Sequence, residues 1–357
     1  MNKKIIFVNA SLTGGGSERV MATLANSLAD MGFDVTMIVV RDKERTYELN
    51  NKVNYIQLTY KNNNILYILF KRIYKIRKII KKRNADTIIS FMSDINFFTI
   101  LSCINLNKRV IISERAHPLL INVNTKKPLY IRILKKLLYP LADGVVFQTK
   151  FAKECYPAKI RKKGYLIPNP ISPNLPDVYN RPRKKVIVAA GRLSEEKNFN
   201  MLISAFYEVS KIHNDYKLII YGRGHMLKNL KLQRKKLNLE DKIKFPGYVD
   251  NLMERIKKAS IYVSSSNFEG ISNSMLEAMA MGIPSICTDC PVGGAAMVIE
   301  NNKNGILIPV GDVLALRDAM LKIIEDEEFG KLLSMEAVKV RDKYDVSKIC
   351  KMWIDVI

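Results

Sequence analysis

The sequence has few cysteines, few histidines and a single tryptophan, and these shortages narrow the possible classes of protein. Its 357 residues include five cysteines, three histidines and one tryptophan. The odd number and scattered spacing of the cysteines do not fit a disulfide-stapled secreted domain and are typical of a reducing compartment. Cys287 and Cys290 form a Cys-x-x-Cys pair, but no second pair or nearby histidine completes a zinc site.

Long hydrophobic runs are also lacking. No stretch reaches the ~20 apolar residues that a membrane-spanning helix needs. The first residues, "MNKKIIFVNASLTGGG", place lysines before an apolar run, but this run is too short for a signal peptide and leads into a glycine loop. We therefore expect neither a membrane span nor a secretory leader, and we expect the protein to be cytoplasmic.

Acidic residues are outnumbered, 34 against 58 basic ones, which gives a formal net charge of +24. Such an excess predicts an anionic partner: nucleic acid, a membrane surface or a phosphorylated substrate. A chain rich in Lys, Asn and Ile explains part of this charge, but it does not explain why the basic residues cluster. Residues 61–84 contain no acidic residue, and 126–140 are similar.

Both basic segments show helical spacing of apolar residues, which is typical of helices that lie on a membrane surface. Alternatively, the apolar stripes pack on the protein's own sheet and the lysines are merely solvated. For residues 65–80 we expect some core packing. We favour peripheral binding to the inner face of the cell membrane, mediated by the lysine-rich side of this segment and by residues 126–139.

Strand-like runs alternate with helical patterns throughout, which predicts an α/β fold. The runs are 4–10, 33–40, 86–91, 109–113 and 144–149, and then 185–191, 216–222, 261–266, 284–288 and 305–310. Continuous β-branched runs indicate parallel strands buried on both faces, and two such blocks predict two doubly wound domains. Residues 167–185 contain five prolines and read as the linker. We expect domains at 1–170 and 171–340, with a C-terminal helix in 341–357 packing back on the first.

The stretch "FEGISNSMLEAMAMGIP" (268–284) places one glutamate, Glu269, before a helix and another, Glu277, inside it. Ser272 or Asn273 can cap this helix, and its amino end favours an anion such as a diphosphate. Carboxylates beside an anion site are suited to accepting hydrogen bonds from sugar hydroxyls. The pattern indicates a sugar nucleotide; alternatively, both glutamates are solvated surface residues.

Two further loops follow strands. In "AAGRLSEEKN" (189–198), Arg192 and Lys197 offer a guanidinium fork and a point charge to phosphate oxygens. In "NASLTGGGSERV" (9–20), consecutive glycines allow a ligand to approach the backbone closely. This loop is not a G-x-G-x-x-G motif, so a dinucleotide role is not favoured. Gly222, in "YGRGHM" (221–226), carries a weak G-x-G signal.

These motifs, together with the closing "NGILIPVGD", resemble the family-4 glycosyltransferases of the GT-B fold over essentially the whole chain. The resemblance implies two Rossmann-like domains facing across a cleft, and metal-independent transfer with retention of configuration, in agreement with the absence of any Asp-x-Asp sequence. It implies a hexose or N-acetylhexosamine donor, with UDP expected and GDP as an alternative. The expected acceptor is a glycan, linked to a polyprenyl diphosphate, in bacterial capsule or other surface polysaccharide biosynthesis. No cofactor is expected.

The resemblance also implies roles for individual residues. Arg192 and Lys197 would hold the donor diphosphate, Glu269 would face the transferred sugar, and Glu277 would bind the ribose. The other expected donor contacts are Gly15, Gly16, Gly222, Gly270, Ile271, Ser272 and Asn273.

Two departures from the family pattern concern the sugar. In "ISERAHP" (112–118), Arg115 stands where family members often carry a histidine, and His117 follows two positions later, so either could meet the sugar or acceptor. Ile271, Ser272 and Asn273 replace the hydrophobic and glycine residues that often follow the first glutamate. The sugar pocket is therefore altered, and the sequence does not identify the sugar.

Three alternatives stay open at this point. A sugar-nucleotide epimerase can share the GT-B fold, and it would act on the donor without an acceptor. A nucleic-acid-binding protein is suggested by charge alone, without a helix-turn-helix, zinc or aromatic RNA-binding signature. An inactive partner subunit is disfavoured because Arg192, Lys197, Glu269 and Glu277 are all present.

Overall fold

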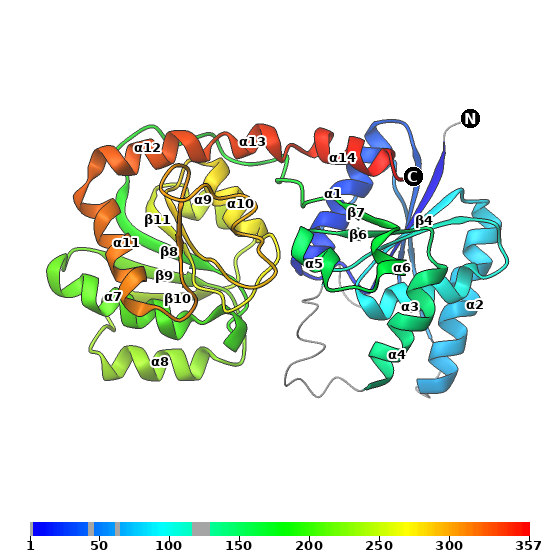
Figure 1. Ribbon diagram of the computed structural model, residues 1–357, viewed down its shortest axis with the longest axis horizontal. Helices are drawn as coiled ribbons and strands as arrows, with labels where there is room; N and C mark the ends of the chain where they lie inside the picture. Colours follow the sequence, from blue (N-terminus) through cyan, green and yellow to red (C-terminus); the bar gives the residue numbers. More distant parts are fainter. Residues whose placement is uncertain (1–2, 42–45, 61–64, 116–128) are drawn as a thin grey trace. The chain divides into compact units, whose positions relative to one another are not determined.

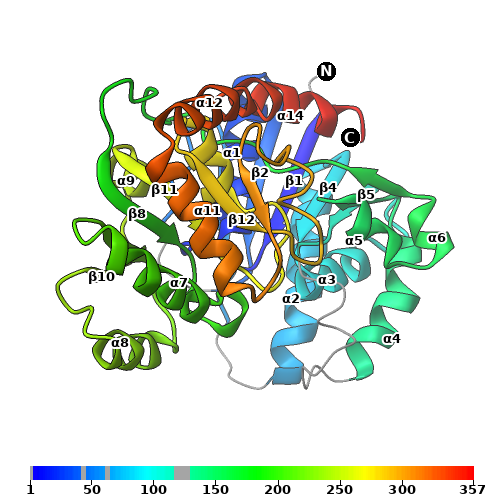
Figure 2. The same ribbon diagram turned by 60° about the vertical axis from the view of Figure 1, so that its left-hand side comes forward.

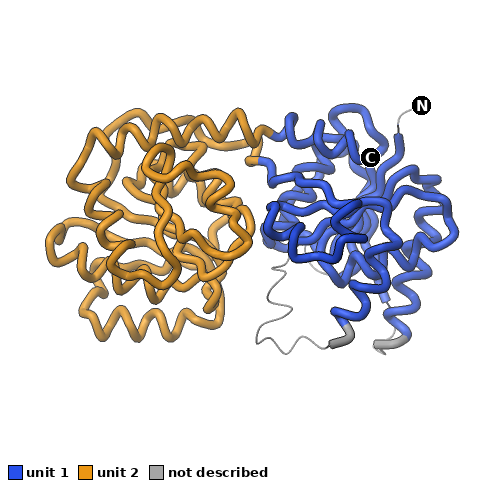
Figure 3. Tube along the Cα trace, viewed as in Figure 1, with its two compact units in different colours: residues 1–170, 346–357 blue, residues 171–345 orange. Residues whose placement is uncertain are grey.

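The computed structural model describes residues 3–41, 46–60, 65–115 and 129–357. These residues form two compact units (Figure 3): unit 1 comprises Met1–Pro170 and Val346–Ile357, and unit 2 comprises Ile171–Asp345. The chain thus enters unit 2 after Pro170 and returns to unit 1 for its last residues. Each unit is a parallel sheet covered by helices (Figure 1).

Unit 1 contains a seven-stranded parallel sheet in the order β3-β2-β1-β4-β5-β6-β7. Its strands are β1 (Lys4–Asn9), β2 (Asp34–Val39), β3 (Asn54–Gln57), β4 (Thr87–Phe91), β5 (Arg109–Ser113), β6 (Gly144–Phe147) and β7 (Gly164–Leu166). Its helices are α1 (Gly16–Asp30), α2 (Ile65–Arg83), α3 (Ser93–Cys103), α4 (Leu129–Leu138), the 3-10 helix η2 (Tyr139–Leu141), α5 (Lys150–Glu154), α6 (Ala158–Arg161) and α14 (Val346–Ile354).

Helices cover both faces of the unit 1 sheet. Helices α1 and α14 lie side by side on one face (Figures 1 and 2), where Trp353 of α14 is fully buried and stacks on Phe91 with ring centroids 5.7 Å apart. On the other face, α3 contacts both α2 and α4. Because both faces are covered, consecutive residues of β1 from Ile5 to Val8 are all buried, as the continuous apolar runs predict.

Unit 2 contains a six-stranded parallel sheet in the order β10-β9-β8-β11-β12-β13. Its strands are β8 (Lys184–Ala190), β9 (Lys217–Tyr221), β10 (Ile243–Gly247), β11 (Ala259–Ser264), β12 (Ser285–Thr288) and β13 (Ile306–Ile308). Its helices are the 3-10 helix η3 (Glu195–Lys197), α7 (Phe199–Ile212), α8 (Leu227–Lys236), α9 (Leu252–Ile256), α10 (Asn273–Ala280), α11 (Val313–Glu325), α12 (Glu327–Ala337) and α13 (Val340–Lys343).

The unit 2 core has two layers, one on each side of the sheet. Helices α7, α8 and α11 contribute to the cluster on one side, and α9, α10 and α13 contribute to the other. Strand order changes direction between β8 and β11, the neighbouring strands at the centre of the sheet. Ligands of open α/β sheets bind beyond the carboxyl ends of the strands at such a switch point.

All ten predicted strand runs are strands in the structure, and they form two doubly wound parallel units as predicted. Three short edge strands, β3, β7 and β10, were not predicted. None of the helices in the described residues is long and apolar enough to cross a membrane.

Candidate functional site

The first part of the site is the loop that follows β8. After Gly191 and Arg192 the chain makes the short helix η3 and reaches Asn198, which has left-handed backbone angles (φ 44°, ψ 46°). Asparagine tolerates this conformation better than most residues, and its side chain accepts a hydrogen bond from the Met201 amide at 3.3 Å, which caps α7. This cap fixes the turn that carries Lys197.

The second part is the loop that follows β11. It runs from Ser265 to Ser272, whose hydroxyl accepts a hydrogen bond from the Met275 amide at 3.4 Å. The predicted cap is therefore Ser272, and Asn273 is the first residue of α10. The helix ends at Ala280, and Gly282 follows with a positive φ of 68°, in keeping with the predicted stop.

Backbone and side-chain hydrogen bonds join these two loops. The Asn267 amide donates to the Glu196 carbonyl at 2.8 Å, and its side chain donates to the Glu195 carbonyl at 3.0 Å. Asn198 donates to the Asn267 side chain at 2.9 Å, and Ser265 donates to the Lys197 carbonyl at 2.9 Å. The loops after β8 and β11 therefore form one piece of structure.

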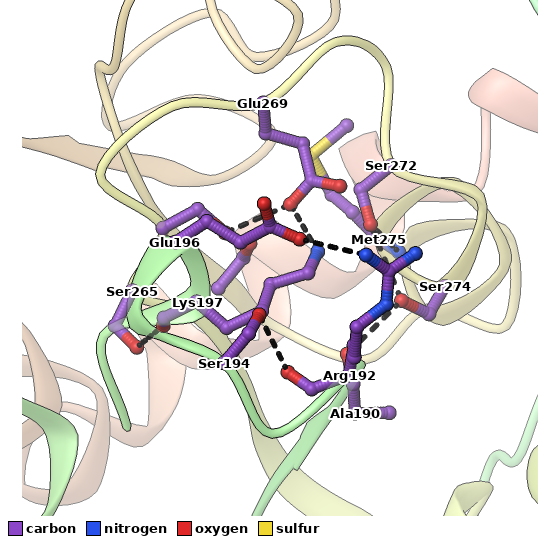
Figure 4. Close-up of polar contacts among 12 residues, drawn as sticks. Ala190, Arg192, Ser194, Glu196, Lys197, Ser265, Glu269, Ser272, Ser274 and Met275 are labelled. Atoms are coloured by element: carbon purple, nitrogen blue, oxygen red, sulfur yellow. Dashed lines mark hydrogen bonds and ion pairs between the residues drawn. The ribbon is translucent and has the colours of Figure 1, made fainter. Parts of the chain in front are cut away.

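Figure 4 shows the charged side chains that these loops bring together. Lys197 donates to the carboxylate of Glu269, and Ser266 donates to the same carboxylate at 2.8 Å. The side chains of Lys197 and Glu269 are 15% and 23% exposed, so this ion pair is largely shielded from solvent. Arg192, by contrast, is 72% exposed and lies 3.5 Å from Glu196. The structure thus brings the predicted residues Arg192, Lys197 and Glu269 to one place, and the guanidinium of Arg192 faces solvent.

Glu277 lies further along α10 and is 1% exposed. A carboxylate is seldom buried to this degree unless its surroundings or a ligand offer it hydrogen bonds. This burial argues against the interpretation of Glu277 as a solvated surface residue.

Two glycines in the site are required by close packing. A Cβ on Gly222, which has a φ of 138°, would lie 1.8 Å from the Gly191 carbonyl oxygen. A Cβ on Gly294 would lie 2.0 Å from the carbonyl oxygen of Gly270. Close packing against Gly191 therefore explains why residue 222 is a glycine, which the weak G-x-G motif did not reveal. The contact of Gly222 with the donor stays a prediction.

The loop after β12 is a part of the site that the sequence analysis missed. The Glu269 amide donates to the Pro291 carbonyl at 3.3 Å, and Val292 and Gly293 follow with positive φ of 84° and 68°. A positive φ at a β-branched residue is uncommon and strained. The double glycine at 293–294, a few residues after the predicted strand 284–288, was the available signal. Nearby, Cys287 and Cys290 are free thiols, and burial raises the pKa of Cys290 to about 11.

In unit 1 the glycine loop after β1 is held by the side chain of Glu18, which lies in the first turn of α1. The Glu18 carboxylate accepts hydrogen bonds from the Ser11 hydroxyl, from the Thr13 amide at 2.6 Å and from the Gly15 amide at 3.1 Å. A donor phosphate approaching Gly15 would compete with this carboxylate for the same amide. The predicted donor contacts of Gly15 and Gly16 stay predictions.

The first-domain residues expected near the sugar fall differently. Arg115 follows β5, donates to Asn169 and lies over the ring of Phe91, 4.2 Å from its centroid. His117 lies outside the described residues. Of the two candidates for contact with the sugar or acceptor, Arg115 is therefore the one whose contacts the structure describes.

Comparison with known proteins covers almost the entire chain. The family model described as Glycosyltransferase Family 4 matches residues 14–175, and the model described as Glycosyl transferases group 1 matches residues 173–339. A relative from Campylobacter jejuni is 28% identical and covers 99% of this chain and 98% of its own. It is named an α-1,4-N-acetyl-D-galactosaminyltransferase of a GalNAc–GalNAc–diNAcBac-PP-undecaprenol.

Two further similarities extend this comparison. The amylovoran biosynthesis glycosyltransferase AmsD of Erwinia amylovora is 25% identical, with full coverage of both chains. The solved structure of HepE from Anabaena, in complex with UDP and glucose, has a TM-score of 0.83. It covers 99% of each chain at 16% identity.

Proposed function

Because the chain belongs to the family-4 glycosyltransferases and has their GT-B fold, we propose that it transfers a hexose or N-acetylhexosamine from a UDP-sugar to a lipid-linked glycan. The transfer retains anomeric configuration and requires neither metal nor cofactor. The product belongs to a bacterial surface polysaccharide or related glycan.

One observation supports this proposal above others: two cationic side chains and one carboxylate lie in loops at the switch point of the unit 2 sheet, and a second carboxylate, Glu277, lies in the helix that follows. Arg192 and Lys197 follow β8, and Glu269 follows the neighbouring strand β11. The amino end of α10 follows the same loop, and the helix dipole there favours an anion. A diphosphate bound there would meet positive charge from side chains and backbone together.

The proposed reaction breaks the bond between C1 of the sugar and the β-phosphate oxygen. A new bond forms from C1 to the acceptor oxygen on the same face, and the acceptor's proton passes to a β-phosphate oxygen. Arg192 and Lys197 stabilise the negative charge that develops on the leaving diphosphate. Since these cations supply the neutralising charge, the proposed mechanism needs no metal ion.

The two glutamates have separate proposed tasks. Glu277, buried in α10, accepts hydrogen bonds from the ribose hydroxyls, and Glu269 accepts them from the transferred sugar. The ion pair with Lys197 holds this carboxylate in a fixed direction. On donor binding, Lys197 contacts both the carboxylate and the diphosphate.

The proposed acceptor carries its glycan on a polyprenyl diphosphate. This proposal takes support from the Campylobacter relative, whose name specifies a PP-undecaprenol substrate. Such a lipid carrier is confined to a membrane, so the enzyme has to work at a membrane surface.

We place that membrane surface against α2 and α4 of unit 1. On α2, Tyr67, Phe70 and Tyr74 are exposed, and Phe70 is 72% exposed. Lys71 lies over the rings of Tyr67 and Tyr74, 5.4 and 5.7 Å from their centroids. Aromatic rings interleaved with lysines suit the boundary between lipid head groups and acyl chains.

Helix α4 presents a similar surface. Ile133 and Leu137 are 49% and 62% exposed, next to the exposed Arg132 and Lys136. Figures 1 and 2 show α2 and α4 on either side of α3. Each basic residue held near an anionic leaflet contributes about 1 kcal/mol. We propose that the protein is cytoplasmic and binds the inner face of the cell membrane through these helices.

One lysine of this segment is unavailable for such contact. Lys135 is 5% exposed and donates to Glu114, whose carboxylate also accepts hydrogen bonds from Tyr139 and Tyr156 at 2.8 and 2.9 Å. Ile76 and Ile80 of α2 are likewise fully buried. The expected core packing of residues 65–80 is thus present, and the face exposed to a membrane is narrower than the sequence indicates.

Thermal shift with a panel of UDP- and GDP-sugars tests the proposal, because a ligand that binds the folded state raises its stability with the logarithm of the ratio of ligand concentration to Kd. Hits are then incubated with lipid-linked acceptors, and the anomeric configuration of the product is read by NMR. Conversion of a donor sugar without any acceptor would instead establish the epimerase alternative. Stabilisation by no nucleotide sugar, together with no transfer, would refute the proposed function.

A further inference from the structure

Arg115 of unit 1 is a covered guanidinium whose hydrogen-bonding capacity is largely unused. Arg115 is the second residue after the end of β5, which ends at Ser113. Its guanidinium lies over the ring of Phe91, the last residue of β4. Its Nη1 group donates to Asn169, which also accepts from Gln148 at 2.7 Å. Arg115 therefore stands at the carboxyl ends of the central strands, where open α/β sheets bind ligands.

Two of its nitrogens have no partner. Nε and Nη2 are buried, and neither donates a hydrogen bond within the part of the chain that the structure describes. The neighbouring carboxylate of Glu114 is already engaged by Lys135, Tyr139 and Tyr156. Burial lowers the pKa of Arg115 to about 9.

Arg183 of unit 2 shows what a structural arginine looks like in this protein. Burial lowers its pKa too, to about 10. Its Nη1, however, donates to the carbonyls of Lys257 and Ala259 at 3.0 and 3.1 Å, and its Nη2 donates to Gly282 at 2.6 Å. Each of these bonds satisfies a backbone carbonyl, so Arg183 stabilises the fold. Arg115 donates to one side-chain amide, and its other edge is unpaired among the residues that the structure describes.

A buried cation without a compensating partner destabilises a folded protein. Its presence here therefore indicates a role other than stability. The ring of Phe91 offers partial compensation through its face. A planar fork with two free N–H groups on one edge matches two oxygens of a phosphate. We propose that Arg115, held by Asn169 and Phe91, is an anion-binding residue of unit 1 that takes a phosphate group of a diphosphate.

This proposal deepens the proposed function, on which it rests for the two diphosphates in question. Unit 2 has its own cations for the donor diphosphate in Arg192 and Lys197. We therefore assign to Arg115 the diphosphate of the lipid-linked acceptor. The role differs from a contact with sugar hydroxyls, for which a charged fork is not needed.

Binding to the full-length protein tests the assignment. The probes are UDP, inorganic pyrophosphate and undecaprenyl diphosphate in detergent micelles, and the variants are Arg115→Met, Arg115→Lys and Lys197→Ala. We expect Arg115→Met to weaken undecaprenyl diphosphate binding about ten- to hundredfold, the range of a charge-assisted hydrogen bond. UDP binding should change less than about twofold. Lys197→Ala should show the reverse selectivity.

Thermal unfolding gives a second readout that a structural role would not produce. Replacing an uncompensated buried charge by an apolar side chain of similar length should raise Tm, so Arg115→Met should be more stable and bind less well. Arg115→Lys, which keeps the charge and loses the fork, should lose less affinity than Arg115→Met and provides the test if the Met variant does not fold.

The outcomes separate cleanly. Weakened UDP binding in Arg115→Met would support the anion site and move it to the donor diphosphate. Unchanged binding of all three probes, whatever the change in Tm, would overturn the proposal. Failure of the wild-type protein to bind UDP would count against the proposed function, while pyrophosphate binding would still decide the role of Arg115.

Discussion

The ammonium group of Lys197 lies against the carboxylate of Glu269, although 72 residues separate them in the sequence. The pair joins the loops that follow β8 and β11, and Ser266 holds the carboxylate from its other side. The lysine that we propose to contact the diphosphate therefore has a carboxylate partner within the protein, and the pair is largely shielded from solvent.

The first prediction concerns the two proposed phosphate-binding cations. Lys197→Ala and Arg192→Ala should each lower kcat/KM by about 30- to 1000-fold, because each removes about 2–4 kcal/mol of transition-state stabilisation. Steady-state kinetics with the identified UDP-sugar measure the change. Lys211→Ala on α7, where an exposed lysine pairs with Glu208, is the matched control. Equal turnover in all three variants would contradict the proposed roles.

A second prediction concerns Gly294, which packs against Gly270. An added Cβ would lie 2.0 Å from the Gly270 carbonyl oxygen, so Gly294→Ala must displace the loop that carries Glu269. We expect a loss of at least about tenfold in kcat/KM, in line with the sensitivity of catalysis to misplacement by 1 Å. Gly330→Ala within α12, where the nearest neighbour of the Cβ lies 3.5 Å away, should leave activity unchanged. Wild-type kinetics for Gly294→Ala would show that the loop does not position Glu269.

The third prediction follows from the buried network around Glu114. Burial by itself would raise the pKa of Glu114, but the charge of Lys135 and hydrogen bonds from Lys135, Tyr139 and Tyr156 lower it below its usual value. A lowered pKa in the folded state adds stability above the unfolded pKa of about 4.3, and this stability is lost as pH falls through the folded value. Urea unfolding from pH 7 to pH 3 should show this loss.

Variants of the same network provide the control. Lys135→Met leaves a buried carboxylate without its cation and should destabilise unit 1 by about 3–5 kcal/mol. The double variant Glu114→Gln/Lys135→Met removes both charges and should recover part of that stability while losing the acid dependence. An acid dependence that is the same in the double variant and in the wild-type protein would rule out Glu114 as its source.

The fourth prediction addresses membrane binding. Replacing Lys78 and Lys82 of α2 by glutamate, or Phe70 and Tyr74 by serine, should reduce flotation with vesicles that contain anionic lipid. The reduction should be largest at low salt, where electrostatic attraction is strongest.

Helix α8 of unit 2 serves as the control for this experiment. It carries the exposed lysines Lys231 and Lys235 but lacks the exposed aromatic residues of α2. Their replacement by glutamate changes the net charge by the same amount. If both pairs of charge reversals reduced flotation equally, general basicity and not the α2 surface would account for binding.

The sequence predicted the parts of this protein that local patterns encode. Each of the ten predicted runs is a strand, and the serine before α10 caps that helix, since both features depend on neighbouring residues. Strands β3 and β7 are short, partly exposed and form the two edges of the unit 1 sheet, so their sequences carry no continuous apolar signal. The glutamate and Arg–Lys motifs were placed correctly at the ends of β11 and β8 because parallel strands bring their carboxyl ends to one edge.

Contacts that depend on distant residues were not accessible in the same way. Nothing local to Lys135 indicates that it is buried against Glu114, and its neighbours Arg132 and Lys136 are exposed. Glu18 is typical of the first turn of a helix, but its carboxylate also accepts hydrogen bonds from amides of the glycine loop that precedes it. The backbone contact between Gly294 and Gly270 likewise arises only once β11 and β12 are paired.

The aromatic contact between Trp353 and Phe91 links helix α14 to Arg115, since Phe91 also lies beneath the guanidinium. Helix α14 thus supports the ring on which a side chain more than two hundred residues earlier in the sequence lies. A change that loosens α14 would displace that ring, and so alter the surroundings of Arg115 without altering the arginine itself.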